Sequence, residues 1–395
     1  MEHSITFTTK RPSATKRTPR HINRNLLFEQ VRARQPVSRA ELSRITGLQR
    51  STVSIIVEEL VDLGWVIEGD ASSLPRGRRP TMIQLNDRQA VLALDIHPAE
   101  MTIAVADLSG RIIAQNVVSM PQDQSKSIKV VISSIRNIIA AHPNRSFNGI
   151  GVSIPGRIDS NLQEFTFAPR LRWPFSGLNK RIQKATGLQV EMDNVANACA
   201  LAEIWFGGSD GLHDLAIVNV SEGIAVGIFA NGKILRGDNG MAGEFGHVQI
   251  YLGQNILCEC GRRGCWETLA SNTAALRYYR DANPAHAVLT FDGLLRLAMS
   301  GEKAAVNALK KMAVFLASGI QMLIAGLAPK EIIIVGDVTA AWHILGPIID
   351  REVRKAPLSR LPIIRTTRDG SSARLRGAAA LVLSKIAVCL ILTLP

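Results

Sequence analysis

The stretch from Gly246 to Cys265 reads GHVQIYLGQNILCECGRRGC, and it contains three of the five cysteines of the chain behind a histidine. Three thiolates and one imidazole make a closed tetrahedral ligand set for zinc, and the glycines between them let a short loop fold back on the ion. Four protein ligands leave no coordination position for water, so we predict a structural zinc and not a catalytic one. The predicted ligands are His247, Cys258, Cys260 and Cys265.

The composition is that of a globular protein with more than one domain. The chain has 395 residues, of which 46% are hydrophobic and 20% are charged, so it can form two or three sizeable cores. No apolar run approaches the roughly 20 residues that span a bilayer, and the N-terminus has no apolar core of a signal peptide. The apolar end, residues 386–395, suggests a buried strand or helix. Cys199 and Cys389 suit buried thiols in a reducing compartment. We therefore expect a cytoplasmic protein without a membrane partner.

Positive charge is concentrated at the start of the chain. The net charge is +13, and residues 1–50 contain eleven Lys or Arg against three Asp or Glu, which leaves an excess of eight positive charges there. Such an excess favours a polyanionic partner, although a solvated basic tail has the same composition.

Residues 22–64 predict three helices in the order of a helix-turn-helix motif. The second helix begins with the capping-box pattern Ser38-x-x-Glu41, and the turn Gly47-Leu48 leads into the third. The third helix has an apolar stripe at Val53, Ile56, Val57, Leu60 and Leu63. Its opposite side is polar near the N-terminus, where a recognition helix reaches base edges. The predicted DNA-binding residues of this helix are Gln49, Arg50, Ser51, Thr52 and Ser54.

Residues 65–85 read WVIEGDASSLPRGRRPTMIQL, which predicts two strands that flank a basic turn. Such a turn is typical of a wing, whose arginines reach phosphates or a narrow minor groove. The predicted contacts are Arg76, Arg78 and Arg79. We therefore expect a DNA-binding domain at 1–82, with a basic N-terminal arm, and a second domain at 83–395.

The second domain shows the same pattern of elements twice. The first copy has strand-like runs at 90–96, 101–108, 111–120 and 148–156 around a helical run at 126–141. The second copy has strand-like runs at 214–220, 224–235 and 331–337. This repetition predicts an α/β body with two similar lobes and a ligand cleft between them.

Residues 231–271 resemble the signature of the ROK family, which groups bacterial sugar kinases with transcriptional repressors. The matching motifs are Gly243-Glu244-x-Gly246-His247, Cys258-x-Cys260-Gly261-x-x-Gly264-Cys265 and Glu267. Kinases of the family generally lack an N-terminal helix-turn-helix, whereas the xylose-type and N-acetylglucosamine-type repressors carry one. The resemblance implies a two-lobed, actin-like and hexokinase-like body, a zinc loop beside a sugar pocket, and a homodimer or tetramer. By the same resemblance, the sugar-binding residues are Asn194, Glu244, His247 and Glu267.

Three segments depart from the pattern of the kinases in this family. Where the kinases have Asn-Asp-Ala-Asn with the Asp as base, residues 194–197 read Asn-Val-Ala-Asn, so Val195 replaces the base. The first phosphate loop reads Asp-Ile-His-Pro-Ala at 95–99, with His97-Pro98 in place of two glycines. The second phosphate loop carries Glu222, a negative charge where phosphate would lie.

These features together predict a sugar-responsive DNA-binding repressor without kinase activity. Its expected partners are a double-stranded DNA operator and a monosaccharide or sugar derivative. One alternative is an active sugar kinase with an added DNA-binding head. Another is a zinc-stabilised nucleic-acid-binding protein without a small-molecule ligand.

Overall fold

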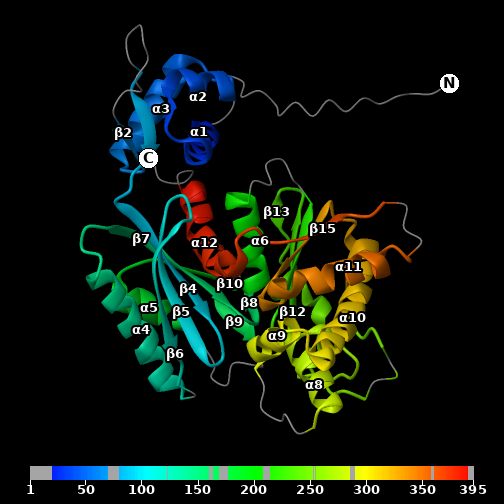
Figure 1. Cartoon of the computed structure of the whole chain (residues 1–395). Helices are drawn as coiled ribbons and strands as arrows, with labels where there is room; N and C mark the ends of the chain where they lie inside the picture. Colours follow the sequence, from blue (N-terminus) through cyan, green and yellow to red (C-terminus); the bar gives the residue numbers. More distant parts are fainter. Residues whose placement is uncertain are drawn as a thin grey trace, which may run out of the picture.

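The computed structural model has a small head and two lobes (Figure 1). It describes residues 20–69, 80–121, 123–159, 163–168, 177–207, 214–251, 253, 255–284, 290–356 and 360–389. The three predicted wing arginines, Arg76, Arg78 and Arg79, lie outside these ranges.

The head contains the three predicted helices and a small sheet of strand order β1-β3-β2. Its elements are α1 (Arg20–Arg34), β1 (Val37–Ser38), α2 (Arg39–Thr46), α3 (Arg50–Asp62), β2 (Val66–Gly69) and β3 (Met82–Leu85). The predicted cap is present, because the Ser38 hydroxyl accepts a hydrogen bond from the Glu41 amide at 3.2 Å. The expected apolar stripe of α3 is buried except for Leu63, which is 48% exposed. The prediction was wrong there because α3 ends at Asp62 and the chain turns away.

The head joins the body through a short turn. The predicted domain boundary after residue 82 falls inside β3, which pairs with both β1 and β2 of the head. The first strand of the body begins only at Gln89. We therefore propose the turn at 86–88 as the boundary between the head and the body.

Lobe I is built on a five-stranded sheet of order β10-β7-β4-β5-β6. Its elements are β4 (Gln89–Ile96), β5 (Glu100–Asp107), β6 (Ile112–Ser119), α4 (Gln124–Ala140), β7 (Ser146–Ile154), β8 (Arg157–Asp159), β9 (Glu164–Phe167), α5 (Leu178–Thr186) and β10 (Val190–Asn194). Strands β4, β5 and β6 form an antiparallel meander, and β7 and β10 are parallel to β4. Strand β4 is buried along nearly its whole length.

Lobe II repeats this topology in its own five-stranded sheet, of order β13-β12-β11-β14-β15. Strands β11 and β12 are antiparallel, and β14 and β15 are parallel to β11. The elements from α6 onward are α6 (Val195–Phe206), β11 (Leu215–Val220), β12 (Ile224–Ala230), β13 (Lys233–Ile234), η1 (Asp238–Gly240), η2 (Glu244–His247), α7 (Trp266–Ala270), α8 (Asn272–Ala282), α9 (Phe291–Met299), α10 (Lys303–Leu327), β14 (Glu331–Val335), η3 (Asp337–Ala341), α11 (Trp342–Val353), β15 (Ile363–Thr366), η4 (Gly370–Ser372) and α12 (Ala373–Cys389). The predicted duplication is therefore confirmed, and the terminal helix α12 returns to pack on lobe I.

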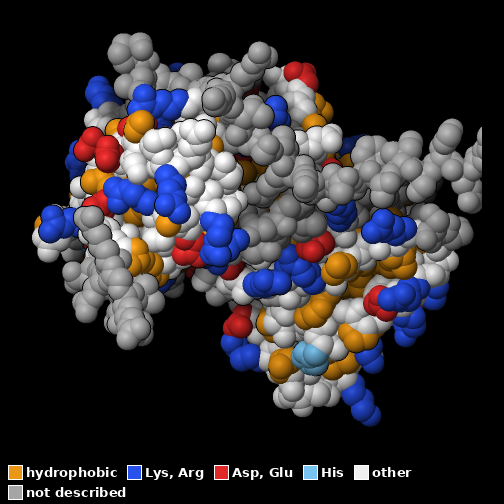
Figure 2. Space-filling model, turned by 90° about the horizontal axis from the view of Figure 1, so that it is seen from above, with side chains coloured by type: hydrophobic (Ala, Val, Ile, Leu, Met, Phe, Trp, Pro, Cys, Tyr) orange, Lys and Arg blue, Asp and Glu red, His pale blue; other side chains and the backbone are white. Residues whose placement is uncertain are grey.

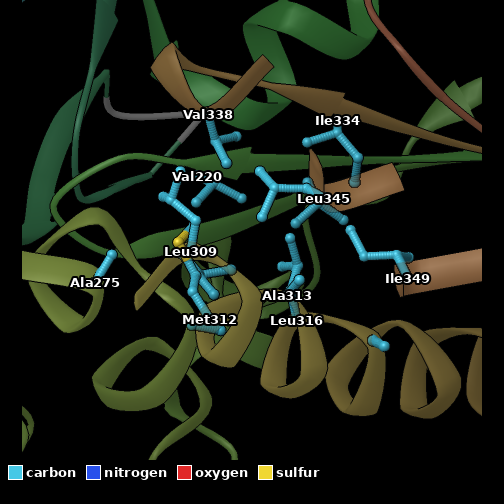
Figure 3. Close-up of a cluster of buried hydrophobic side chains, with 14 of the residues drawn as sticks. Val220, Ala275, Leu309, Met312, Ala313, Leu316, Ile334, Val338, Leu345 and Ile349 are labelled. Carbon is cyan, nitrogen blue, oxygen red and sulfur yellow. The ribbon is translucent and has the colours of Figure 1, made fainter. Parts of the chain in front are cut away.

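Helix α10 lies in the core of lobe II. By length and composition alone this 25-residue helix could cross a membrane, and the sequence argument overlooked it. Its apolar face instead packs against the sheet and α11 (Figure 3). The packed side chains include Leu309, Met312, Ala313 and Leu316 of α10 with Val220, Ile334, Leu345 and Ile349. The apolar character of α10 is thus accounted for by burial within the protein.

Candidate functional site

A cleft with about 900 Å³ of empty space, open to solvent, lies between the two lobes. Lobe I contributes the turn after β7 and the start of α6, where side chains follow the ends of parallel strands. Lobe II contributes the turn between β11 and β12, the short helix η2 and the start of α7. The structure brings all four predicted sugar residues to the wall of this cleft: Asn194, Glu244, His247 and Glu267.

Asn194 joins the two lobe I segments of the cleft wall. Its side-chain oxygen accepts from the Ala196 amide at 2.8 Å, which caps α6. Its side-chain nitrogen donates to the Gly156 carbonyl at 2.7 Å. An amide group offers two lone pairs and two hydrogens, so one of each remains for a ligand.

Glu244 and Arg157 face each other across the cleft. Arg157 Nε lies 3.4 Å from Glu244 Oε2, and the guanidinium stacks 4.5 Å from the ring centroid of Phe167. Burial raises the pKa of Glu244, while the charge of Arg157 acts to lower that pKa. His247 Nε2 lies 3.7 Å from the same carboxylate oxygen. A carboxylate, a guanidinium and an imidazole thus converge at one point, where they can bind vicinal hydroxyls.

The predicted metal ligands form one compact cluster. The ligand atoms of His247, Cys258, Cys260 and Cys265 all lie within 4.8 Å of one another. Cys260 and Cys265 Sγ are 3.7 Å apart, and Cys258 Sγ is 3.4 Å from His247 Nδ1. In a tetrahedral site with Zn–S bonds of about 2.3 Å, two sulfurs are separated by about 3.8 Å. The cluster therefore has the donor set and the spacing to hold a metal ion.

Two of these thiols are protonated unless a cation binds them. Burial raises the pKa of Cys265 to about 11. The pKa of Cys258 is also raised, mainly by burial and in addition by a hydrogen bond to Glu267. Metal ligation requires thiolates, so an ion that enters must displace these protons. Glu267 Oε1 also lies 3.5 Å from His247 Nδ1, so the cluster and the cleft wall share residues.

An ion cluster forms around Asp95, near the end of β4 in lobe I. Asp95 Oδ2 lies 2.9 Å from His97 Nε2 and 3.2 Å from Arg374 Nε. Burial acts to raise the pKa of Asp95, but Arg374 and His97 together lower that pKa. Pro98, which follows His97 in the chain, lines the cleft, and so does Glu222. The carboxylate of Asp95 is therefore neutralised by the protein itself.

The recognition helix of the head presents the predicted polar residues to solvent. Gln49, Arg50 and Ser51 are exposed, and Thr52 and Ser54 are partly exposed. Viewed from the side that carries the head, the surface shows Lys and Arg side chains on the head and on the body (Figure 2). This surface has the charge that a polyanion requires.

Comparison with known proteins identifies the family of the body. The model of the ROK family matches residues 91–385. The chain belongs to the ROK family. It is 30% identical to the xylose repressor of Bacillus subtilis over 317 residues, which cover 79% of this chain and 81% of that protein.

Two solved ROK structures cover different shares of this chain. A ROK family transcriptional regulator, a homologue of the Escherichia coli MLC protein, has a TM-score of 0.80 at 25% identity and covers 94% of this chain and 98% of its own. A ROK glucokinase from Streptomyces griseus, in complex with glucose and AMPPNP, has a TM-score of 0.65 at 26% identity and covers 74% of this chain and 98% of its own. The likeness to the regulator extends over most of the chain, including a part that the kinase does not cover. The comparisons therefore favour a regulator over a kinase.

Sequence reasoning about this ROK chain missed two arginines. Arg157 lies in the cleft, directly after Pro155 and Gly156 at the end of the buried strand β7, and a Pro-Gly pair in that position could have indicated a cleft turn. Arg374 is the second residue of α12, almost 280 residues after Asp95. No local signal in the sequence indicates that Asp95 and Arg374 meet.

Proposed function

We propose that the protein is a DNA-binding transcriptional regulator of the ROK family whose operator affinity is controlled by a monosaccharide or sugar derivative. The observation that carries this proposal is the presence, in one chain, of a helix-turn-helix head with an exposed polar recognition helix and a cleft lined by Asn194, Glu244, His247 and Glu267. The similarity to the xylose repressor of Bacillus subtilis supports the same function.

The same cleft is poorly suited to phosphoryl transfer. Val195 lines it where a general base would stand, and a hydrocarbon side chain cannot accept a proton. Asp193, the nearest carboxylate along the chain, instead pairs with Arg236 at 2.7 Å and accepts from Asn197 at 2.9 Å. Phosphoryl transfer depends on backbone donors and cations around the nucleotide. We infer that the protein binds sugar without phosphorylating it.

We infer that the Cys/His cluster holds one zinc ion in a structural role. Three cysteines and a histidine are a closed donor set for zinc, and the ion would be bound by protein groups alone. The cluster adjoins Glu267, so an ion there would lie next to a residue of the cleft wall and hold the loop that carries that residue.

We also propose a homodimer or tetramer that binds a two-fold symmetric operator in the cytoplasm. One helix-turn-helix reads only a short half-site, and paired recognition helices supply the second. The wing arginines Arg76, Arg78 and Arg79 are proposed to add phosphate or minor-groove contacts.

Footprinting and a salt series test the DNA-binding part. Arg50→Ala should weaken operator binding by about 1–3 kcal/mol and relax specificity at one base pair if the side chain contacts a base. Arg351→Ala is the matched control, because it removes the same charge from an exposed position in lobe II. Affinity for the operator that is insensitive to salt, or a single asymmetric half-site, would contradict the assignment.

Calorimetry and an ADP-release assay test the sugar-binding part. Xylose, glucose and N-acetylglucosamine are the probes, and we expect at least one to bind. With magnesium and ATP present, we expect no sugar-dependent ADP release. Release at ordinary kinase turnover, abolished by Glu244→Gln, would show instead that the protein is a kinase with a DNA-binding head.

A further inference from the structure

Helix α6 connects the cleft to the underside of the head. Its cap, Asn194, and its first turn, through Asn197, line the cleft. Its last two residues, Trp205 and Phe206, contact Arg32 on α1 of the head. Figure 1 shows α6 and α12 beneath α1. At 1.5 Å per residue, the twelve residues of α6 span about 18 Å.

Arg32 caps the C-terminal end of α6 from the head. Its Nη1 donates a hydrogen bond to the Trp205 carbonyl. This carbonyl is one of the last four of the helix, which have no partner within the helix and carry the negative end of its dipole. The guanidinium also lies 4.7 Å from the Trp205 ring centroid and 5.5 Å from that of Phe206. A charge, a hydrogen bond and two aromatic faces therefore hold one head residue to the end of α6.

Phe206 is fixed by the body on its remaining sides. The Arg376 guanidinium, from α12, lies 4.7 Å from the ring centroid. A Cβ atom placed on Gly110 would lie only 2.5 Å from the ring, so this turn of lobe I has no spare space. Phe206 is therefore packed closely between the head, the Gly110 turn and α12, so a shift of the end of α6 displaces the groups that contact it.

The backbones of β12 and α12 pack directly against the backbone of α6. A Cβ atom on Gly227 of β12 would lie 2.3 Å from the Ala196 carbonyl oxygen. A Cβ atom on Gly377 of α12 would lie 2.7 Å from the Ala198 carbonyl carbon. Because no side chain stands between these backbones, a shift of the lobe II sheet is transmitted to the first turns of α6 and to α12.

The head has little freedom to move independently of the body. Only residues 86–88 separate β3 from β4. Asn86 Nδ2 donates to the Gly64 carbonyl at 2.8 Å, and the Asn86 amide donates to the Trp65 carbonyl at 3.0 Å. The buried apolar side chains of the head are continuous with those of β4 and α12. A change in the position of α1 against the body therefore changes the orientation of the whole head.

We propose that Arg32 couples the sugar cleft to the DNA-binding head. This inference rests on the proposed function and names the residue through which regulation acts. Closure of the lobes on sugar moves the N-terminal end of α6, which displaces Trp205 and Phe206 and shifts α1 through Arg32. The sugar then changes operator affinity by as much as it prefers one arrangement of the lobes over the other.

The test compares two arginines of the same helical turn. Arg32→Gln removes the contact with α6. Arg34→Gln is the matched control, because Arg34 is exposed and bonds to Gln30 of its own helix. The readout is operator affinity with and without xylose, glucose or N-acetylglucosamine. Coupled sites typically show ratios of about 5–150-fold. We expect Arg32→Gln to bring this ratio below about twofold, with sugar affinity of the DNA-free protein unchanged.

The outcomes separate the inference from the function on which it rests. If Arg32→Gln keeps the wild-type ratio, or if Arg34→Gln loses it equally, the coupling role of Arg32 is overturned. If wild-type protein shows no sugar dependence of operator binding, the proposed function itself is contradicted.

A second measurement needs no sugar. Asn194→Ala removes the cap of α6, and Thr290→Ala removes an equivalent cap from α9, where the hydroxyl accepts from the Gly293 amide at 3.1 Å. Hydrogen exchange of the amides of α1 should be faster in the Asn194 variant than in the Thr290 variant. Equal exchange of α1 in both variants and in wild type would overturn the coupling.

Discussion

The two ends of the cleft differ in what their charged groups face. At the sugar end, Glu244 and Glu267 point toward a space that a ligand can enter, beside a Cys/His cluster that fixes their surroundings. Residues 95–99 correspond to the first phosphate loop of the kinases, and we call this region, with Glu222, the phosphate end. There, Asp95 faces His97 and Arg374 of the protein itself. The first group of charges is available to a ligand, whereas the second is used in contacts within the protein. This difference is what the proposed function predicts for a regulator built on a fold that it shares with kinases.

The phosphate end is tied to the helix that packs beneath the head. Arg374 is the second residue of α12, and α12 packs against α6 and beneath the head. A polyphosphate would need backbone N–H donors and a cation, whereas Pro98 has no N–H and Glu222 adds a negative charge. The pair between Asp95 and Arg374 joins β4 to α12, the helix that packs beneath the head.

Loss of the metal ion should have the largest effect, and it should act at the sugar end. Structural zinc contributes on the order of 10 kcal/mol in small peptides, and each kcal/mol shifts Tm by about 2–4 °C in domains of 150–250 residues. We expect Cys260→Ser to lose the metal, to lower Tm by about 20–40 °C and to weaken sugar binding. Elemental analysis and thermal unfolding check this prediction.

Cys199→Ala is the control for that experiment, because Cys199 is a buried thiol outside the cluster. It should keep one zinc per chain. A metal content of zero in the wild type, or an unchanged content in Cys260→Ser, would contradict the site.

Asp95→Asn should have the next largest effect, on stability. Removal of one partner from a buried ion pair costs about 3–5 kcal/mol. The lowered pKa of Asp95 means that its carboxylate stabilises the fold above the unfolded pKa, near 3.9, and that this contribution is lost as pH falls through the folded pKa. Urea unfolding should therefore show a gap between wild type and variant that is full at pH 7 and shrinks below about pH 4.

A double variant decides whether the pair with Arg374 is the cause. If it is, Asp95→Asn combined with Arg374→Met should be less destabilised than the two single changes together predict. Strict additivity, or a gap that does not vary with pH, would mean that the pair with Arg374 does not account for the stabilising effect of the Asp95 carboxylate.

Glu244→Gln and Glu222→Gln compare the two ends directly. Hydrogen bonds to charged groups contribute about 1.5–3 kcal/mol, so Glu244→Gln should weaken sugar binding by roughly 10- to 100-fold. Glu222→Gln, at the phosphate end, should change it by less than about threefold. Calorimetry with the sugar that binds the wild type measures both, and equal losses would contradict the proposed position of the sugar.

The elements and the metal cluster were predictable because their signals are local. The Ser38 cap, the apolar stripe of α3 and the repeated strand pattern each follow from residues a few positions apart. The Cys/His cluster lies within twenty residues, so its spacing restricts its geometry. The family resemblance was needed to select Glu244 and Glu267, because isolated glutamates carry no pattern of their own.

The contacts between distant segments were not predictable. Asp95 meets Arg374 and Arg32 meets Trp205 only because the duplicated fold brings α12 and α6 back beneath the head. The misplaced Leu63 and the overlooked helix α10 have a related cause. Periodicity gives the apolar face of a helix, but the point where the helix ends and the elements that cover it depend on tertiary packing.

The smallest effect should come from restoring the missing acid. Val195 is 2% exposed and lines the cleft at the start of α6, so Val195→Asp places a carboxylate where the kinases of the family have their base. General-base assistance alone is worth about 10²- to 10⁴-fold in rate. It acts only on a bound and neutralised nucleotide, and Pro98, Glu222 and the occupied carboxylate of Asp95 still oppose that binding. We therefore expect no sugar-dependent ADP release from Val195→Asp, measured with magnesium and ATP beside a ROK glucokinase as positive control. Turnover in this single variant would show that the phosphate end still binds nucleotide. The side chain at position 195 alone would then separate this chain from an active kinase.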